Sequence, residues 1–388
     1  MSPSVVIVGG GVMGAATACF LARDHGVHAL VLERDPTHAR ASSALSASSI
    51  RQQFSTPLNI ALSLWSVEFL RRIGDELAVG DERPPIGLVE AGYLYLATPA
   101  GATTLRDLHA LQREAGADVA LLQPDAMRSR FPWLAVHDLA LGALGESGEG
   151  WFDGPALLQA FRRKAITCGA RFEAGDVIDF DTRGDGVLAV RCADGRRFDA
   201  GTVVLTAGAW TAPLAARLGV ALPVTAAKRD VFVLDSPEVL PGCPLLIDPS
   251  GVWCRREGHG FIAGAPPRGD DVHEAPLEAI DHALFDDVIW PVLAARVPAF
   301  EALRVRSAWA GYYDMNRFDQ NGLAGRLPGW RNAYTACGFS GHGMQHAPAV
   351  GSAMAALIAG GRSSAPALDA LSAQRLVDNQ PLIERNVI

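Results

Sequence analysis

The distribution of apolar positions is most regular at the start of the chain. Val5–Val8 and Ala29–Leu32 are short uninterrupted apolar runs, which are typical of parallel strands buried on both faces. A glycine turn follows the first run, helical periodicity extends over about Met13–Asp24, and Gly26 is a C-terminal stop signal. This pattern predicts a β-α-β unit.

The rest of the chain alternates between helical and strand-like periodicity. The expected helices are Asn59–Ile73, Leu105–Ala115, Pro155–Gly169, Leu277–Ala295 and Ala349–Ala359, and the expected strands are Gly92–Thr98, one ending at Val177, the hairpin Val187–Cys192 with Arg196–Ala200, the start of Gly201–Thr211, and Ala333–Ala336. We interpret the glycine-rich stretch Gly142–Gly154 as a crossing between domains. Short strands with many Pro and Gly over Val224–Phe300 predict a separate, mostly antiparallel region.

The composition narrows the class of protein. Hydrophobic residues make up 49% and charged residues 20% of the 388 residues, which predicts a large core rather than global disorder. The formal net charge is −8 and no Lys/Arg run stands out, so nucleic acid is not an expected partner. The six cysteines are scattered without a CxxC pair, which argues against a disulfide framework or a structural zinc.

Targeting signals and membrane spans are not expected either. The chain reaches its first apolar strand by Val5, with no basic segment or cleavage site before it. No apolar run approaches the roughly 18 residues that a membrane span needs. We therefore expect a cytoplasmic protein without a transmembrane segment.

The glycine turn of the first unit has the spacing of a dinucleotide-binding fingerprint. Gly9, Gly11 and Gly14 fit GxGxxG between a strand and a helix, and Glu33 ends the next strand 19 residues after Gly14. The first glycine allows the tight turn, the second lets the backbone approach a pyrophosphate, and the third lets helix and sheet close. Glu33 can accept hydrogen bonds from a ribose. The alternative is a glycine turn in an ordinary α/β protein.

Further glycine motifs favour FAD over NAD, although the two share the fingerprint. Thr206–Trp210 (TAGAW) ends a buried strand, where the backbone could approach a cofactor a second time. Gly338–Pro348 (GFSGHGMQHAP) would provide a third approach near the C-terminus. A cofactor contacted by both ends of the chain must be long, and FAD is long.

The C-terminal motif also contains two histidines, His342 and His346, at the spacing of a helical zinc site. Gly341 and Gly343 disfavour a helix, and Pro348 suits a first helical turn, so we expect the two histidines in a loop and a helix start. No third ligand is identifiable, and we predict no metal. A glycine loop before a helix N-terminus favours negative charge instead.

Several stretches together resemble the D-amino-acid oxidase/sarcosine oxidase superfamily of flavoproteins. They are VIVGGGVMGAATACFLAR, TAGAW and GFSGHGMQHAPAVG. Within the superfamily, SIRQQFSTPLNIALS, DPSGVWCRREG, RVPAFEALRVRSAWAGYYDMNRFDQNGLAG and the closing ERNVI resemble the FAD-dependent-oxidoreductase-domain branch, which is near the sarcosine oxidase β-subunits and dimethylglycine dehydrogenase. The resemblance extends over nearly the whole chain.

The resemblance implies an α/β plus antiparallel β fold of the glutathione-reductase-like type. A discontinuous Rossmann-like FAD-binding domain would consist of residues 1–85, 145–222 and 305–388. A substrate-binding domain with an antiparallel sheet would consist of residues 86–144 and 223–304. The implied reaction is oxidation of a secondary, N-methylated or cyclic amine or amino acid, in which hydride transfer to the flavin gives an imine that water hydrolyses.

The resemblance also implies site residues. Arg51 matches an arginine that binds the substrate carboxylate, with an interface ion pair as the alternative, and Tyr312 matches a tyrosine near the substrate, with an aromatic core position as the alternative. Gln345 stands where relatives have a second, carboxylate-binding lysine, which argues against simple sarcosine as substrate. His342 is expected to pack the loop or contact the flavin. The expected cofactor contacts are Gly9, Gly11, Val12, Met13, Gly14, Glu33, Arg34, Ser42, Ser43, Ser49, Arg51, Val177, Ala207, Gly208, Trp210, Gly338, Gly341, His342, Gly343, Met344 and Gln345.

Departures from the relatives bear on the electron acceptor and on flavin attachment. Ile262 stands where oxidases have a lysine that assists the reaction with oxygen, so we expect a dehydrogenase or poor oxidase that uses a quinone or protein acceptor. Ala310 and Gly311 occupy the position of a flavin-linking cysteine, and no histidine lies between Ala39 and Arg51, so non-covalent FAD is expected.

The remaining interpretations concern two arginines, one cysteine and the alternative functions. Arg255 and Arg256 are interpreted as solvated strand residues, with a reach into the substrate pocket as the alternative. Cys337 is interpreted as a small buried hydrophobic residue. The alternative functions are a flavin-dependent 2-hydroxy-acid dehydrogenase and a FAD-binding assembly factor with little turnover.

Overall fold

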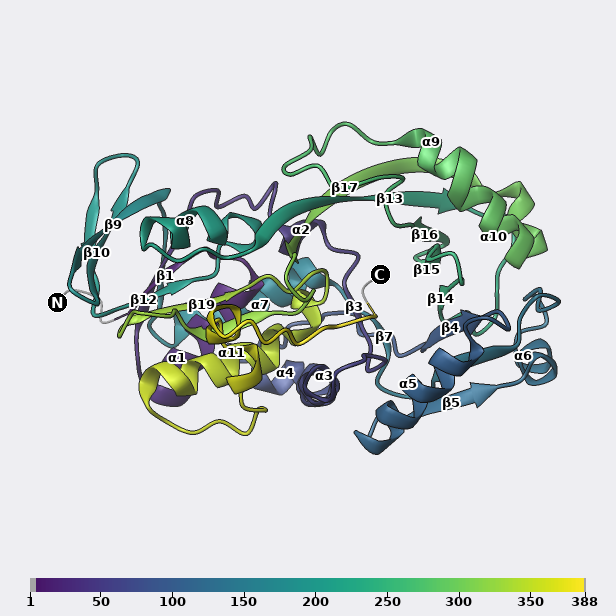
Figure 1. Cartoon of the computed structure of the whole chain (residues 1–388), viewed down its shortest axis with the longest axis horizontal. Helices are drawn as coiled ribbons and strands as arrows, with labels where there is room; N and C mark the ends of the chain where they lie inside the picture. The colour runs from purple at the N-terminus through teal and green to yellow at the C-terminus, as the bar shows by residue number, and fades with distance from the viewer. Residues whose placement is uncertain (1–4, 387–388) are drawn as a thin grey trace.

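A six-stranded, mostly parallel sheet organises one half of the molecule. The computed structural model describes residues 5–386, and its first sheet has the order β18-β19-β12-β1-β2-β8 (Figure 1). The bounds are β1 (Val5–Val8), β2 (Ala29–Glu33), β8 (Arg171–Ala174), β12 (Thr202–Leu205), β18 (Leu323–Arg326) and β19 (Ala333–Cys337). Because β1 pairs in parallel with both β2 and β12, the predicted β-α-β unit forms the centre of this sheet.

Alternate residues of the central strands pack into two different cores. On one face, Val5 and Ile7 pack with the helices α1 (Val12–His25), α3 (Pro57–Arg71), α7 (Gly154–Thr167) and α11 (Gly343–Ala359). On the other face, Val6 and Val8 pack under a three-stranded sheet of β9 (Val177–Arg183), β10 (Gly186–Cys192) and β11 (Arg197–Asp199) and under α8 (Thr211–Arg217). The uninterrupted apolar runs are explained by this burial on both faces.

An eight-stranded sheet organises the other half, in the order β17-β13-β16-β15-β14-β4-β6-β5. Its strands are β4 (Tyr93–Ala97), β5 (Val119–Leu122), β6 (Leu141–Gly145), β13 (Val224–Asp235), β14 (Leu245–Ile247), β15 (Trp253–Glu257), β16 (Gly260–Gly264) and β17 (Arg304–Asn316). All pairs are antiparallel except β14 with β4. The long strands β13 and β17 run from one half of the molecule to the other (Figure 1).

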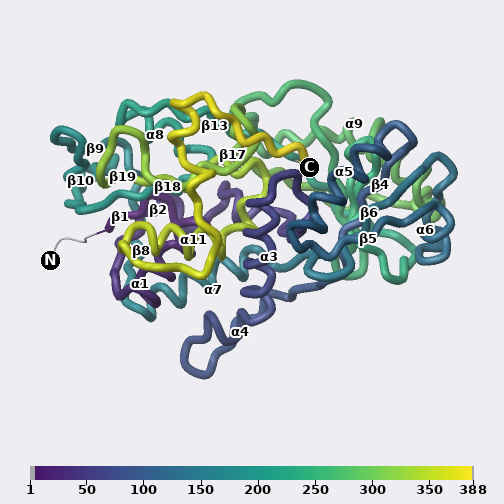
Figure 2. The backbone as a smooth tube through the Cα atoms, turned by 60° about the horizontal axis from the view of Figure 1, so that its bottom comes forward, coloured from purple at the N-terminus to yellow at the C-terminus, as the bar shows by residue number. Residues whose placement is uncertain are grey.

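The remaining elements are short or lie at the edges of the two sheets. They are α2 (Ser42–Leu45), β3 (Ser49–Ile50), α4 (Ile73–Glu76), α5 (Ala102–Glu114), α6 (Pro124–Arg130), β7 (Gly150–Trp151), α9 (His282–Leu284), α10 (Trp290–Arg296) and α12 (Gln374–Val377), with 3-10 turns at Gly208–Trp210, Pro298–Ala302 and Asp369–Leu371 and a π-turn at Phe285–Ile289. The pair β3–β7 lies where the two halves meet. The described C-terminal segment, which reaches Asn386, also lies in this central region (Figure 2).

The structure differs from the sequence-based elements at several points. Val177 begins β9 and does not end the preceding strand, which stops at Ala174. Residues Leu141–Gly145 of the glycine-rich crossing form a buried strand. The helix expected from Leu277 begins at His282, since Asp281 caps it by accepting a hydrogen bond from Leu284 N.

Two further differences have a tertiary cause. The last helix begins at Gly343 rather than Ala349 and contains Pro348, because burial of Met344–Ala356 outweighs the low helix propensity of Gly and Pro. The domain division placed residues 305–388 together, but β17 pairs with β13 over nearly its whole length and so belongs to the eight-stranded sheet. Residues 1–4 of the first predicted range, and Val387 and Ile388 of ERNVI, lie outside the described residues.

Among residues 5–386, no helix is long and apolar enough to cross a membrane.

Candidate cofactor and active site

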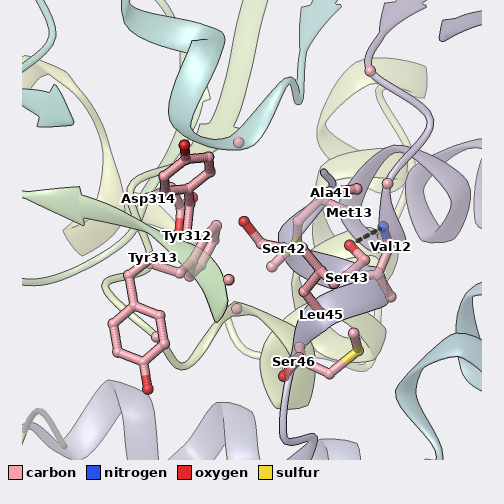
Figure 3. Close-up of a pocket in the computed structure, with 18 of the residues that line it drawn as sticks. Val12, Met13, Ala41, Ser42, Ser43, Leu45, Ser46, Tyr312, Tyr313 and Asp314 are labelled. Atoms are coloured by element: carbon pink, nitrogen blue, oxygen red, sulfur yellow. Dashed lines mark hydrogen bonds between the residues drawn. The ribbon is translucent and has the colours of Figure 1, made fainter. Parts of the chain in front are cut away.

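A large cavity lies between the two halves of the molecule. Its volume is about 500 Å³, within the usual range for small-molecule sites. One wall is formed by the carboxyl ends of β1, β2 and β12 and by the segment around α2. The opposite wall is formed by β13, β14, β15 and β17, and the start of α11 closes one side. Figure 3 shows the Ser42 side chain of the first wall directed toward Tyr312 of the second, whereas the Ser43 hydroxyl points toward Val12.

The glycine fingerprint has the close contacts that its spacing predicts. Gly9 has φ +105°, and a Cβ there would lie 2.5 Å from Thr206 O. At Gly14 a Cβ would lie 2.0 Å from Gly9 O, so this glycine permits α1 to pack against β1. Gly14 does not line the cavity, whereas Gly9 and Gly11 do. The third glycine is therefore a packing position rather than a cofactor contact.

The N-terminus of α1 opens into the cavity, as a phosphate site requires. Val12 N donates a 3.0 Å hydrogen bond to Ser43 Oγ (Figure 3). The Glu33 carboxylate accepts from Gly10 N at 2.7 Å and from Asp35 N at 2.9 Å and retains further lone pairs for a ribose. Together these groups form a cradle of backbone amides with a carboxylate at its end.

The second glycine turn lies beside the first. Thr206 Oγ1 donates to Gly9 O at 2.9 Å, which ties the end of β12 to the fingerprint. Gly208 has φ +54°, and it lines the cavity together with Ala207 and Trp210. The Arg34 guanidinium lies 4.1 Å from the centroid of the Trp210 ring. The predicted residues Val12, Met13, Ser42, Ser49 and Val177 also line the cavity.

The third glycine motif approaches the cavity from the C-terminal end of the chain. Gly341 has φ +97°, and a Cβ there would lie 2.4 Å from the Tyr313 ring. Gly341, Gly343 and Met344 line the cavity, but Gly338 does not. Gly338 has φ +71° and donates its N–H to Asp314 Oδ2 at 2.7 Å, so its role is to form the turn.

His342 and His346 lie at the end of the loop and at the helix start, as expected. His342 caps α11, His346 is in its first turn, and their rings meet edge to face at a centroid distance of 5.1 Å. Burial lowers the pKa of His342 to about 3, with a contribution from Arg51, and burial also holds the pKa of His346 well below its usual range. No group of three metal-binding side chains occurs within residues 5–386.

Both histidines are therefore neutral, but only one has a partner. Ser63 Oγ lies 3.0 Å from His346 Nε2. Neither ring nitrogen of His342 has a hydrogen-bond partner in the described part of the chain, although the side chain is only 3% exposed. Since His342 lines the cavity, its ring can bind a polar atom of a molecule held there.

Arg51 is buried, and its guanidinium binds main-chain oxygens. Nη1 donates to Gln53 O at 2.9 Å and Nη2 to Asn386 O at 2.5 Å, above the Phe54 ring at 4.1 Å. Within residues 5–386 the guanidinium forms no ion pair, so the alternative of an interface ion pair is not found there. Gln345 Oε1 accepts from Arg51 N at 2.7 Å.

Tyr312 lines the cavity, but its hydroxyl has a backbone partner. The OH donates to Ala275 O at 2.8 Å, and the ring meets Trp210 edge to face at 5.8 Å. The hydroxyl therefore has the backbone partner that is expected of a tyrosine in an aromatic core. The ring nevertheless forms part of the cavity wall.

Two buried carboxylates, Glu149 and Asp314, lie beside the site, and sequence reasoning missed the first of them. Burial raises the pKa of Glu149 to about 7 and that of Asp314 to about 6. Glu149 Oε1 accepts from Gln52 N at 2.5 Å and from Gln53 N at 3.1 Å, which joins β7 to the segment after β3. Gly145, where a Cβ would lie 1.9 Å from Glu149 Oε2, was the available signal, since the glycine makes room for the carboxylate.

Arg255 is not a solvated strand residue. It is 4% exposed, and its Nη2 donates to Ala47 O at 2.6 Å next to the cavity. Its charge is opposed by Glu257, to which Nη1 donates. Ile262 is the cross-strand partner of Arg255 and is 1% exposed. Cys337 is buried in β19, as expected.

The chain was compared with known proteins. Residues 4–357 match the family described as FAD dependent oxidoreductase (DAO). The FAD-dependent oxidoreductase domain-containing protein 1 of Xenopus laevis is 43% identical, over 99% of this chain and 84% of its own length. Glycine oxidase of Geobacillus kaustophilus is 30% identical, over 91% of this chain and 92% of its own length.

Solved structures agree with this match. The L-proline dehydrogenase of P. horikoshii has a TM-score of 0.87 at 24% identity, with 98% of this chain and 99% of that chain covered. The glycine oxidase structure from Geobacillus kaustophilus has a TM-score of 0.77 at 26% identity, with 95% and 97% covered. These comparisons confirm the predicted fold class and FAD as the cofactor. The chain belongs to the DAO family of FAD-dependent oxidoreductases.

Proposed function

We propose that this FAD-dependent oxidoreductase oxidises the C–N bond of a secondary amine or amino acid, either N-methylated or cyclic. The observation that carries the proposal is one continuous cavity, with backbone amides and Glu33 at one end and a wall of the eight-stranded sheet at the other. Glycine oxidase and sarcosine oxidase among the relatives support the amine class. When bound, FAD supplies a hydride acceptor for the carbon next to nitrogen, and water hydrolyses the resulting imine.

The residues present fit FAD. Gly9 and Gly11 leave room where a Cβ would collide with Thr206 or approach Ser43, and the N-terminus of α1 favours a pyrophosphate. Glu33 would hold the ribose. At the other end, Gly343 and Met344 begin α11, whose N-terminal dipole favours negative charge on the ring system.

The polar groups near α11 suit an amine. His342 is neutral, so it does not repel a substrate ammonium and can accept a hydrogen bond from its N–H. Gln345 has its oxygen occupied by Arg51 N, which leaves its NH₂ group as a donor. The Arg51 guanidinium is held by two carbonyl oxygens, and Arg51 N donates to Gln345 Oε1. Arg51 therefore fixes the position of the Gln345 amide. A substrate carboxylate would find one cation, Arg51, beside neutral donors rather than two cations.

The acceptor that we propose is a quinone or an electron-transfer protein rather than oxygen. A cation beside the flavin stabilises developing superoxide, and Ile262 supplies none. The guanidinium of the neighbouring Arg255 is paired with Glu257. Reduced holoprotein should therefore reoxidise slowly in air-saturated buffer and rapidly with a quinone. Rapid reoxidation in air would contradict this part of the proposal.

The experiment is anaerobic reduction of the purified holoprotein. Secondary amino acids, their decarboxylated amines and 2-hydroxy acids are added separately, and the loss of flavin absorbance is followed. We expect bleaching by secondary amines, with release of an aldehyde or keto acid and the residual amine. Bleaching by 2-hydroxy acids alone would indicate the hydroxy-acid dehydrogenase. Resistance to every compound, with co-purification of a partner protein, would indicate an assembly factor.

A further inference from the structure

The wall of the cavity that belongs to the eight-stranded sheet is apolar over several adjacent strands. Its members are Tyr93 of β4, Val231 of β13, Leu245 and Ile247 of β14, Trp253 of β15, and Ala265 directly after β16. They share one face, because strand pairing aligns Ile247 with Trp253 and Leu245 with Tyr93. Side chains from strands that are distant in sequence thus form one continuous surface.

The indole of Trp253 lies flat across this wall. Its cross-strand partner is Gly264, and a Cβ on Gly264 would lie 2.8 Å from the indole ring. Gly264 in turn pairs with Val231 on the next strand. A side chain at position 264 would lift the indole away from the sheet. The glycine therefore creates a broad aromatic floor with aliphatic side chains on either side.

The cations near this floor already have partners. Arg229 Nη1 lies 2.5 Å from Asp271 Oδ1, and Asp271 also pairs with Arg317 at 2.9 Å. The guanidinium of Arg51 is held by two main-chain oxygens. Gln345 is uncharged. A small zwitterion such as glycine could use the positive charge that Arg51 retains, but it would leave the apolar floor in contact with water.

We propose that the site selects amines with a bulky apolar substituent, aromatic or branched aliphatic, which packs on the wall formed by Trp253, Ile247 and Leu245. This inference rests on the proposed amine oxidation and names the class of substrate within it. The amine nitrogen remains at the polar end of the cavity, near His342 and Gln345. Glycine and sarcosine are poor substrates, because their groups are too small to cover the wall.

The first test measures binding without turnover. Acetate, 3-methylbutyrate and phenylacetate have the same carboxylate, and each is titrated into oxidised holoprotein while the flavin spectrum is followed. A methylene in an apolar pocket is worth about tenfold or more in discrimination. We expect phenylacetate to bind roughly 100-fold more tightly than acetate. Equal affinities, or no binding by any of the three, would overturn the inference.

The second test measures anaerobic reduction by sarcosine, N-methylalanine, N-methylleucine and N-methylphenylalanine. The rate at low substrate concentration should increase along the series, and Trp253→Leu should reduce the advantage of the aromatic substrate by roughly tenfold. Trp133→Leu is the matched control, because Trp133 donates to Pro241 O in another core and does not line the cavity. Reduction by sarcosine at least as fast as by the aromatic substrate would refute the inference.

Failure of the proposed amine oxidation and failure of the proposed apolar subsite would give different results. If none of these amines reduces the flavin but phenylacetate still binds much more tightly than acetate, the amine chemistry is wrong and the apolar subsite stands. If sarcosine reduces the flavin best and acetate binds as well as phenylacetate, the amine chemistry stands and the apolar subsite is wrong.

Discussion

Glu384 fastens the C-terminal segment to the centre of the molecule, and its replacement by alanine should be strongly destabilising. The side chain is fully buried. Its carboxylate accepts from Ser55 N at 2.8 Å, Ser55 Oγ at 2.6 Å, Thr56 Oγ1 at 2.9 Å and Asn59 Nδ2 at 2.9 Å. Asn386 N adds a fifth bond at 3.0 Å. Glu384→Ala would leave all of these donors without an acceptor.

The magnitude follows from the burial of the donors. An unsatisfied buried donor costs about 1–3 kcal/mol, and water entering the space left by the side chain would recover part of this. We therefore expect a loss of about 3–5 kcal/mol in unfolding free energy. For a chain of 388 residues, that corresponds to a decrease of roughly 4–6 °C in Tm. Asn386 O also binds the Arg51 guanidinium, so the variant should weaken FAD retention as well.

Differential scanning calorimetry and FAD release on dilution would measure the two effects. Glu238→Ala is the control, because Glu238 is an exposed glutamate in a loop. Glu384→Gln retains one acceptor oxygen and should fall between the wild type and the alanine variant. Burial alone would raise the pKa of Glu384, but hydrogen bonds from Ser55 lower it, so this stabilisation is present above the unfolded pKa and is lost as the pH falls. A decrease in Tm below about 2 °C for Glu384→Ala would refute the reasoning.

Three further predictions concern other parts of the structure. Gly14→Ala places a Cβ 2.0 Å from Gly9 O, so we expect protein without bound FAD or insoluble protein, measured by the ratio of flavin to protein absorbance. Burial raises the pKa of Glu149 to about 7, so its contribution to stability is complete below the unfolded pKa and falls by roughly 3 kcal/mol as the pH rises through 7. Glu149→Gln should flatten the dependence of urea midpoints on pH between about 4.5 and 7, and an unchanged dependence would contradict the assignment. Gln345→Lys adds a cation at the cavity and should increase the preference for an amino acid over its decarboxylated amine by about tenfold in kcat/KM, whereas an unchanged ratio would place the carboxylate elsewhere.

Local patterns were sufficient for part of the fold and the site. The β-α-β unit and the roles of Gly9 and Gly14 depend on residues close in sequence, and their contacts follow from strand, turn and helix geometry. The partners of Arg51 could not be predicted, because Asn386 is far away along the chain. The start of α11 was misplaced because its burial against α1 and α3 is tertiary. The apolar floor under Trp253 depends on the register of several strands, and no local pattern encodes that register.

The contribution of both chain ends to the cavity has a consequence for biosynthesis. Strand β19 lies between β12 and β18, and α11 packs on α1, so neither the sheet nor its helical layer is complete until the ribosome has made residue 359. Glu384 and Asn386 then join the segment after β3. The nascent chain must therefore hold its N-terminal fingerprint open until residue 359 has been made. Flavin capture would follow synthesis of Glu384 and Asn386, and termination before residue 384 would remove the fastening.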